Sequence, residues 1–328
     1  MKKIRWGILS TANIGQTQFI PAIFRAENAE AVAIASRGPK VHEIAKQLNI
    51  PTEYESYEEL LDDPNVDAVY IPLPNHLHKE WVEKAANKGK HVLCEKPAAL
   101  NMEEAARMVK TCEDHQVKFM EGYMYQLHPQ HDRVKEIIAS GEIGPVKLIK
   151  SSHSFHLENQ DNIRMDQSMG GGSLFDVGCY AIQLIRHITD DEPAEVSAFA
   201  ELKAGVDIST VGYLKMKSGI TALFDCSFDM VARNEYEIVG MKGTIKVPYA
   251  YRPDRNGGVG ELIITTGDTA RKEKTFGDIY KLEVEHFSDA ILNDLQPRIT
   301  GESTVKNMKV IEACYRSIDT GQPVKISD

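Results

Sequence analysis

Cysteine is scarce in this sequence, and long apolar runs are missing. Only five cysteines occur among 328 residues, and they lie far apart and form no C-x-x-C pair. A disulfide framework and a thiolate metal site are therefore not indicated. No window reaches the roughly 18 consecutive apolar residues that a membrane helix needs, and the N-terminal MKKIRWGIL lacks the small-residue cleavage site of a signal peptide. We expect a soluble protein of the cytoplasm with no membrane partner.

Clusters of lysine and arginine are missing as well. The chain has 38 basic and 48 acidic residues, which gives a net charge of -10. Nucleic-acid affinity depends on basic side chains that neutralise phosphates, so we expect no nucleic-acid partner. Apolar residues make up 42% and charged residues 26% of the chain, which is ordinary globular usage. At about 100 to 200 residues per domain, the length allows two domains.

The first 122 residues alternate short apolar runs with helical patterns. Six strands are expected, among them IRWGILS, AEAVAIAS, VDAVYIP as the fourth, HVLCE as the fifth and VKFMEGY as the sixth, with helices that include residues 14–26, 40–48 and 77–87. This alternation is typical of β-α-β units around a parallel sheet. We therefore predict an α/β fold that begins with a dinucleotide-binding Rossmann domain, residues 1–122, built on a doubly wound parallel sheet of six strands.

After residue 123 the pattern changes to longer runs with period-two alternation, such as VKLIKSSHSF, STVGYLKMK and GITALFDCSF. Turn-like KSG and MKG segments separate such runs, as in an antiparallel meander. We predict a second α+β domain, residues 123–328, with a large and mostly antiparallel sheet. Amphipathic helices at 280–293 and 304–320 are expected to cover one face of this sheet. A sheet covered on one face often buries the other by association, so a homodimer through this sheet is expected.

A turn with the spacing of G-x-G-x-x-G follows the first predicted strand, but serine and alanine replace its first two glycines. Small residues there let the backbone approach a pyrophosphate at the N-terminus of the next helix, and the last glycine allows close packing of that helix on the strand. An ordinary β-to-α turn is the alternative, and the position after the first strand of an α/β unit favours dinucleotide binding. The expected contacts are Ser10, Thr11, Ala12, Asn13, Ile14 and Gly15.

The second predicted strand ends in Ser36 and Arg37. Folds that prefer NAD usually place an Asp or Glu here to bind the ribose 2′-hydroxyl. Without that carboxylate, and with a guanidinium within reach of a 2′-phosphate, NADP is the better fit. In the alternative, Arg37 is only a solvated loop residue and NAD binds.

Polar residues gather after the fourth predicted strand, in the segment PLPNHLH at 72–78. Ligands of open α/β sheets bind at the carboxyl ends of the strands. Asn75 either contacts the cofactor or only caps the helix that carries His78. No metal is predicted here, because no Asp, Glu or Cys accompanies the histidines at ligand spacing, nor at His153 and His156, which point to opposite faces of a strand. The expected cofactor contacts are Pro72, Leu73, Asn75 and His78.

The fifth predicted strand ends in Glu95-Lys96-Pro97, at the sheet edge where the nicotinamide is expected. The ammonium of Lys96 can polarise a substrate hydroxyl or carbonyl, and a cationic nicotinamide nearby would lower the pKa of Lys96. Pro97 biases Lys96 towards an extended backbone, which aims its side chain. The alternative is a surface turn with a structural Glu-Lys pair. We predict that Lys96 is catalytic and that Glu95 and Lys96 also contact the cofactor.

E-K-P after the fifth strand, with P-x-P-N-x-x-H before it, resembles the Gfo/Idh/MocA oxidoreductase family over essentially the whole chain. The segment GGGSLFDVGCY, residues 170–180, resembles the glycine-rich turn and D-x-G-x-x motif of that family. Tyr180 stands where many members have His, which is similar to the branch of dimeric dihydrodiol dehydrogenases and bacterial D-xylose dehydrogenases. The resemblance implies hydride transfer between a nicotinamide cofactor and a sugar, polyol or cyclic vicinal diol, with Tyr180 as acid/base and Lys96 as its partner.

The spacing of Asp176 and Tyr180 agrees with that role. They are four residues apart at the start of a predicted helix, so both side chains project to one face. A lysine ammonium nearby would lower the phenol pKa from about 10, and Asp176 would orient the tyrosine or the substrate. In the alternative, the tyrosine only packs at the helix start and Asp176 is a cap. Weaker candidates for substrate contacts are Tyr123, His128 and Arg164.

Two other functional classes fit the same family shape. In one, a tightly held NAD transiently oxidises a sugar so that a glycosidic or ether bond can be cleaved, with no net redox change. In the other, the protein is a dinucleotide-binding regulator without turnover. A regulator needs neither Lys96 nor Tyr180, so their presence favours an enzyme.

Overall fold

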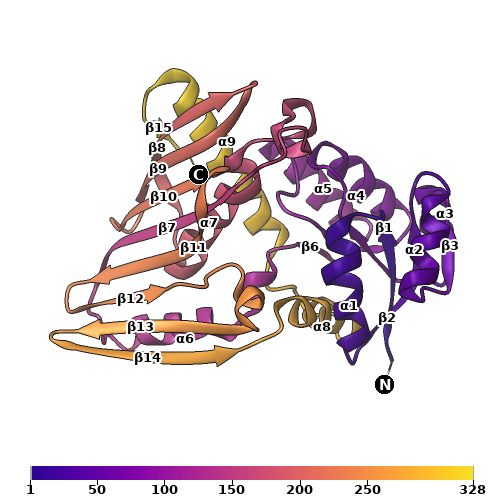
Figure 1. The fold of residues 1–328 in the computed structure, drawn as a ribbon, viewed down its shortest axis with the longest axis horizontal. Coiled ribbons are helices and arrows are strands. Elements are labelled where there is room, and N and C mark those ends of the chain that lie inside the picture. The colour runs from indigo at the N-terminus through magenta and orange to yellow at the C-terminus, as the bar shows by residue number, and fades with distance from the viewer. Residues whose placement is uncertain (1, 328) are drawn as a thin grey trace. The chain divides into compact units, whose positions relative to one another are not determined.

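Six parallel strands form the sheet of the first unit in the computed structural model, which describes residues 2–327 (Figure 1). Their order is β3-β2-β1-β4-β5-β6, and every neighbouring pair is parallel. The predicted doubly wound sheet is therefore confirmed. The strands are β1 (Ile4–Leu9), β2 (Ala29–Ala35), β3 (Thr52–Tyr54), β4 (Ala68–Ile71), β5 (His91–Cys94) and β6 (Phe119–Glu121).

Helices connect these strands, and side-chain caps begin two of them. Ser56 Oγ accepts a hydrogen bond from Glu59 N, and Asn101 Oδ1 accepts one from Glu104 N at 2.8 Å, as serine and asparagine do at helix starts. The helices of this unit are α1 (Ile20–Arg25), α2 (Lys40–Leu48), α3 (Tyr57–Asp62), α4 (His78–Asn87), α5 (Met102–Asp114) and α8 (Ile279–Leu292), with a π-helix at Gly15–Phe19 and a 3-10 helix at Asn75–Leu77.

Helix α8 belongs to the first unit, although it comes late in the chain. This unit comprises the chain through Met124 together with Tyr280–Lys306. The fully buried Trp6 of β1 donates from Nε1 to Ser288 Oγ at 3.1 Å, and its ring lies 5.8 Å from that of Phe287. Our expectation that this helix covers the second sheet is wrong, because its apolar side meets Trp6. The division at residue 122 correspondingly omits this segment.

The second unit contains a sheet of nine strands in the order β14-β13-β12-β11-β7-β10-β9-β8-β15. It comprises Tyr125–Ile279 and the chain from Asn307 onward. Only β10 and β7 pair in parallel, so the predicted, mostly antiparallel sheet is confirmed. The strands are β7 (Val146–His156), β8 (Pro193–Lys203), β9 (Val206–Met216), β10 (Thr221–Ser227), β11 (Asp229–Gly240), β12 (Gly243–Val247), β13 (Val259–Thr266), β14 (Thr269–Phe276) and β15 (Val324–Lys325).

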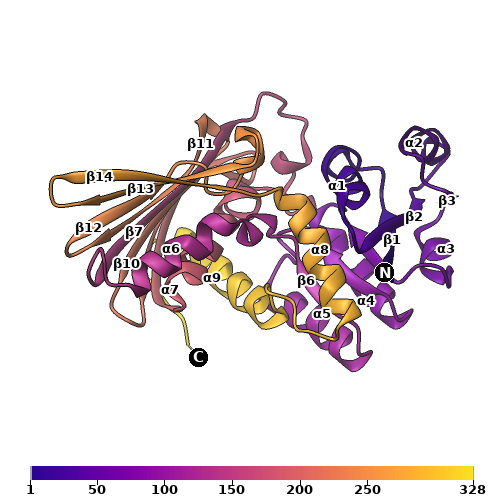
Figure 2. The same ribbon diagram turned by 90° about the horizontal axis from the view of Figure 1, so that it is seen from below.

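Helices cover one face of this sheet. Figure 2 shows α6 (Pro129–Ala139) and α7 (Cys179–Thr189) on the same side of the strands. The remaining segments are α9 (Gly301–Thr320), a π-helix at Leu174–Gly178 and 3-10 helices at Met124–Leu127, Ile163–Met165, Gln167–Met169 and Pro253–Asn256. Across residues 2–327, no helix is long and apolar enough to cross a membrane.

The opposite face carries exposed apolar side chains on three adjacent strands. Phe199 of β8 is 64% exposed, Val211 of β9 is 50% exposed, and Tyr213 and Leu223 are also exposed. They line one shallow hollow of the sheet surface together with polar residues such as Asp225. Because side chains alternate along a strand, these residues form a continuous apolar surface, which we call the open face.

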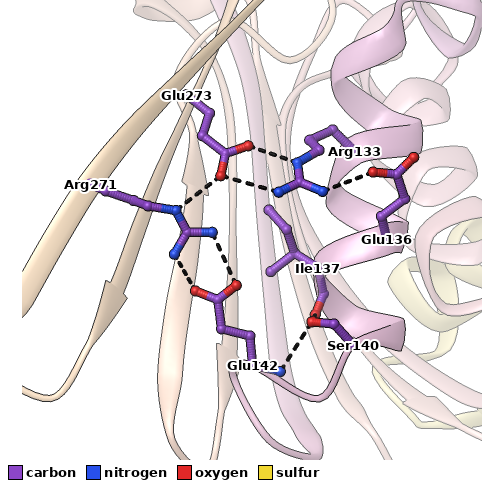
Figure 3. Close-up of polar contacts among 7 residues, drawn as sticks. All are labelled: Arg133, Glu136, Ile137, Ser140, Glu142, Arg271 and Glu273. Atoms are coloured by element: carbon purple, nitrogen blue, oxygen red, sulfur yellow. Dashed lines mark hydrogen bonds and ion pairs between the residues drawn. The ribbon is translucent and has the colours of Figure 1, made fainter.

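Charged side chains connect the edge strand β14 to α6 (Figure 3). Arg133 donates to Glu273 at 2.7 Å and to Glu136 at 2.8 Å. Arg271 donates to Glu273 at 2.9 Å and also pairs with Glu142. The hydrogen bond from Arg133 lowers the pKa of Glu273. Because these groups are partly exposed, each pair contributes only about 0.2–1 kcal/mol.

Candidate active site

The turn after β1 is shaped by its own side chains. Ser10 has a φ of 137°, and its Oγ accepts a hydrogen bond from Ala12 N at 2.9 Å. Gln16 Nε2 donates to the carbonyl oxygen of Thr11 at 2.6 Å. The π-helix begins at Gly15 and continues into α1. The first amides of a helix have no acceptor within it, so this helix start can receive a phosphate.

The packing around Gly15 differs from our expectation. A Cβ at this position would lie 3.7 Å from Ile8 Cγ2 and 3.9 Å from atoms of Pro72 and Tyr70. These are ordinary contact distances, so packing of the helix on the strand does not by itself require glycine. A larger side chain, however, has no free space towards the strand.

Gly15→Val and Gly15→Ala form a matched pair for testing the turn. We expect Gly15→Val to weaken NADPH binding about tenfold or more, because overpacking costs about 1–3 kcal/mol and distorts the turn. Gly15→Ala should bind nearly as well as the wild type. Fluorescence titration with NADPH measures both, and thermal unfolding serves as the control for folding. Wild-type affinity in the valine variant would remove this turn from the cofactor site.

The ends of the first three strands are joined by short polar side chains. Thr11 Oγ1 and Ser36 Oγ lie 3.3 Å apart, and Ser36 N donates to the carbonyl oxygen of Tyr54. Arg37 follows as an exposed residue. On the nearby β3 side, His42 lies 2.8 Å from Glu55 Oε1, and that carboxylate raises the pKa of His42. This pair was not predicted from the sequence, because it joins residues 13 apart on different elements.

Glu95 is held in place at the carboxyl end of β5. Tyr70 donates from its hydroxyl to Glu95 Oε1 at 2.6 Å, and Lys96 N donates to Glu95 Oε2 at 3.2 Å. Burial, followed by the charge of Glu95, raises the pKa of Tyr70 well above its usual value. Lys96 is partly exposed, and its peptide bond to Pro97 is cis. Both oxygens of the Glu95 carboxylate therefore accept hydrogen bonds, one of them from the backbone amide of Lys96.

His78 lies inside the unit beneath this edge. It is fully buried, with Nδ1 2.9 Å from the carbonyl oxygen of Pro97 and Nε2 2.7 Å from that of Leu73. Burial lowers its pKa to about 4, whereas donation to both carbonyl oxygens at once requires the protonated ring, because a neutral ring has a single N–H. The contacts tie the loop after β4 to the loop after β5. Asn75 occupies no cap position, since Leu77 is the N-cap of α4 and Pro74 that of the preceding 3-10 helix.

The segment that carries Asp176 and Tyr180 begins with a π-helix, not with the regular α-helix that we expected. Cys179 N donates to the carbonyl oxygen of Leu174, five residues back. A Cβ at Gly178, within this π-helix, would be only 2.8 Å from Cys226 Sγ of β10. The wider turn thus fits closely on the sheet. Single π-turns often occur at functional sites.

Asp176 and Arg164, two of the predicted residues, lie together in the second unit. Arg164 Nε donates to Asp176 Oδ2 at 2.7 Å. The Asp176 side chain is 15% exposed and that of Arg164 39% exposed. A charge-assisted hydrogen bond of this kind fixes the guanidinium, which also donates from Nη1 to Asn162 Oδ1 at 3.4 Å.

Aromatic rings surround Tyr180, which is 5% exposed. Ring centroids of His153, Tyr251 and Tyr125 lie 5.2, 5.4 and 5.7 Å from that of Tyr180. Tyr125 in turn donates its hydroxyl to Gln183 Oε1. From the sequence, His153 was considered only as a metal ligand and rejected, and its position beside Tyr180 was not predicted. Its place on β7 was visible, but the pairing across elements was not.

The two remaining candidates for substrate contacts, Tyr123 and His128, are buried in the protein interior. Tyr123 is fully buried. His128 is also fully buried, with Nδ1 accepting from Gln130 N and Nε2 3.1 Å from the carbonyl oxygen of Gly258. Burial lowers the pKa of His128, and its position is that of the N-cap of α6. Within the described residues 2–327, no cluster of three or more His, Cys, Asp or Glu could hold a metal ion.

Comparison with known families matches both units. Residues 4–123 match the profile described as "Oxidoreductase family, NAD-binding Rossmann fold", and residues 131–246 match the GFO/IDH/MocA C-terminal domain. Over 324 residues, the chain is 39% identical to D-xylose 1-dehydrogenase (NADP(+)) 2 of Haloferax volcanii, which covers 98% of this chain and 99% of that protein.

Two solved structures are similar over nearly the whole chain. The aldose-aldose oxidoreductase of Caulobacter crescentus, complexed with glycerol, has a TM-score of 0.92 at 27% identity and covers 99% of this chain and 100% of its own. A 3-ketoreductase of Actinomadura kijaniata, in complex with NADP and TDP-benzene, has a TM-score of 0.91 at 27% identity. The match covers 97% of this chain and 98% of the ketoreductase chain. Variants of one lysine and one tyrosine of this ketoreductase have also been solved.

Proposed function

Because the chain belongs to the Gfo/Idh/MocA family of oxidoreductases, we propose that it transfers hydride between NADP and a carbon that carries a hydroxyl group in a sugar, polyol or cyclic vicinal diol. The xylose dehydrogenase relative supports a sugar-like substrate and NADP. The observation that carries the proposal is the edge at β5, where Glu95 is held through both carboxylate oxygens and Lys96 follows it.

The residues at the strand ends of the first unit fit a nicotinamide cofactor. Neither Ser36, Arg37 nor the turn at 10–15 contains a carboxylate that would repel a 2′-phosphate. Pro72, Leu73, Asn75, Glu95 and Lys96 would complete the contacts. His78 would act from beneath, by holding the two loops together. When bound, the cofactor accepts or supplies the hydride.

Tyr180 would exchange the proton of the substrate hydroxyl, and Lys96 would supply positive charge that stabilises the phenolate. Asp176 would orient the substrate through Arg164. One feature of a relative supports the first two roles. The lysine and the tyrosine replaced in the ketoreductase variants have the same separation along that chain as Lys96 and Tyr180 have here.

The test is a panel of sugars, polyols and cyclic diols with NADP and with NAD, followed at 340 nm. We expect reduction of NADP with at least one class of hydroxyl compound. Product formation without any change at 340 nm would indicate a lyase or hydrolase that returns its cofactor. Tight cofactor binding without turnover across the panel would favour a regulator.

Arg37→Ala should separate the two cofactors. We expect NADP binding to weaken about tenfold, near the lower end for a hydrogen bond to a charged group, because Arg37 is exposed. NAD binding should hardly change. Fluorescence titrations of wild type and variant with NADPH and NADH measure both effects. Equal losses for the two cofactors would contradict a contact with the 2′-phosphate.

We propose further that two copies associate through the open face. Its exposed apolar side chains on β8, β9 and β10 would be buried by a second copy. Sedimentation should give twice the chain mass for the wild type and one chain mass for Phe199→Asp. Phe276→Asp is the matched control, because Phe276 is equally exposed at 71% but lies on β14. A monomeric wild type would reject the proposal.

The cytoplasm is the location that we propose. All five cysteines are buried and none forms a disulfide, which suits a reducing compartment. Fractionation of cells that express the chain, followed by immunoblotting, tests this location.

A further inference from the structure

Asp207, at the start of β9, is a buried carboxylate that the proposed reaction does not use. It is 2% exposed. Its Oδ2 accepts hydrogen bonds from Ser173 Oγ at 2.6 Å, Leu174 N at 2.7 Å and Thr210 Oγ1 at 3.0 Å. Its Oδ1 accepts one from the Tyr315 hydroxyl at 2.8 Å. None of these four donors is a cation, although an unpaired buried charge is costly.

The donors explain how the charge is accommodated. Leu174 is the first residue of the π-helix that leads to Asp176 and Tyr180. A carboxylate at a helix start is stabilised by the amide that it accepts from and by the helix dipole. Asp207 is thus an N-terminal cap supplied by a neighbouring strand, not by the helix itself.

Gly172 makes room for this cap. It has a φ of 123°, and a Cβ there would overlap Asp207 Oδ1 and lie 3.0 Å from the Tyr315 hydroxyl. The carbonyl oxygen of Gly172 also accepts from Asp176 N at 3.0 Å. The last glycine of the GGG run therefore leaves space for the Asp207 carboxylate. Cofactor binding and proton transfer do not explain a glycine at this position.

Tyr315 extends the same connection to α9. Its hydroxyl bonds Asp207, and its ring lies 5.1 Å from that of Phe175, the residue before Asp176. The turn that precedes Tyr180 is consequently attached to β9 by polar contacts and to α9 by a ring contact. All these groups lie within the second unit.

We infer that Asp207 is a positioning residue: its carboxylate fixes the turn at Ser173 and Leu174 and thereby the placement of Asp176 and the Tyr180 phenol. The inference rests on the proposed function, in which Tyr180 carries the proton. Misplacement of a reacting group by about 1 Å can cost about 100-fold in rate. Loss of this cap should therefore lower turnover while leaving cofactor binding intact.

Ser173 and Thr210 offer a matched comparison. Both hydroxyls are buried and donate to the same oxygen of Asp207, but only Ser173 belongs to the turn. We expect Ser173→Ala to lower kcat about tenfold and Thr210→Val to leave kcat within twofold of wild type. In Asp207→Asn, the amide oxygen can keep the Oδ2 contacts and the amide can donate to Tyr315, so its loss should be smaller than that of Asp207→Ala.

The experiment combines kcat and KM of the full chain with hydrogen exchange of the amides at 173–180. Ser173→Ala and Asp207→Ala should show faster exchange there, a lower kcat and an unchanged KM for NADP. Equal kcat losses in Ser173→Ala and Thr210→Val, or unchanged exchange at 173–180, would overturn the inference. If Asp207→Ala fails to fold, Ser173→Ala decides. Wild-type turnover in Tyr180→Phe would instead reject the proposed function. Hydrogen exchange of the amides at 173–180 would still test whether Asp207 fixes this turn.

Discussion

Replacing Tyr180 by phenylalanine should lower turnover by about 100- to 10,000-fold, the usual contribution of a general acid or base. The substitution removes only the hydroxyl, so the ring contacts with His153, Tyr251 and Tyr125 are retained. Affinity for NADP should hardly change, because the cofactor contacts are assigned to the first unit. Steady-state rates with one active substrate and an NADPH titration measure the two effects.

Tyr236→Phe is the control for this substitution. Tyr236 is a buried tyrosine of the same unit that lies 3.1 Å from His131 Nδ1 through its hydroxyl. It has no role in the proposed reaction, so its loss should affect unfolding more than turnover. Should Tyr180→Phe stay within threefold of wild type, Tyr180 is a packing residue and the proton carrier must be sought elsewhere.

Lys96→Met should be at least as damaging as Tyr180→Phe. Methionine keeps the length of the side chain but removes both a hydrogen-bond donor and the positive charge. In the proposed reaction, oxidation of the alcohol rises with pH as the tyrosine loses its proton. Without the ammonium, which favours the phenolate, this rise should move to higher pH. A pH series of turnover for wild type and variant measures the shift.

Two further variants define the role of the charge. Lys96→Arg retains it and should keep the wild-type position of the pH rise, even if the rate falls. Lys118→Met removes another lysine of the first unit, whose Nζ pairs with Asp294 at 2.6 Å, and should leave the profile unchanged. A wild-type pH profile and rate in Lys96→Met would show that the Glu-Lys pair is structural.

The sheet of the first unit was predictable because its signals are local. Alternating apolar runs and helical patterns mark each strand and helix in turn, and caps such as Asn101 are read from a few neighbouring residues. Lys96 was predicted as a candidate for the same reason. The end of a strand can be located from the sequence alone, and in a parallel sheet it marks the carboxyl edge where ligands bind.

Other features depend on contacts between distant residues. The amphipathic pattern predicted that α8 buries its apolar side. That this side packs on the sheet of the first unit depends on its contact with Trp6, which is distant in the sequence. The close approach of Gly178, in the π-helix before Tyr180, to Cys226 joins residues that no local period relates. For the same reason, the ring of His153 beside Tyr180 and the bond from Tyr70 to Glu95 were not predicted.

The charged network on β14 affects whether further copies of the chain can add to the edge of the second sheet. An edge strand offers unpaired backbone groups to any other strand, and such additions can continue without limit. Here one edge carries charged side chains of both signs, with Arg271 paired with Glu142 and Glu273, and the other edge is β15, only two residues long. Growth along the sheet is disfavoured at both ends. The proposed association through the open face would close after two copies if a twofold axis relates them.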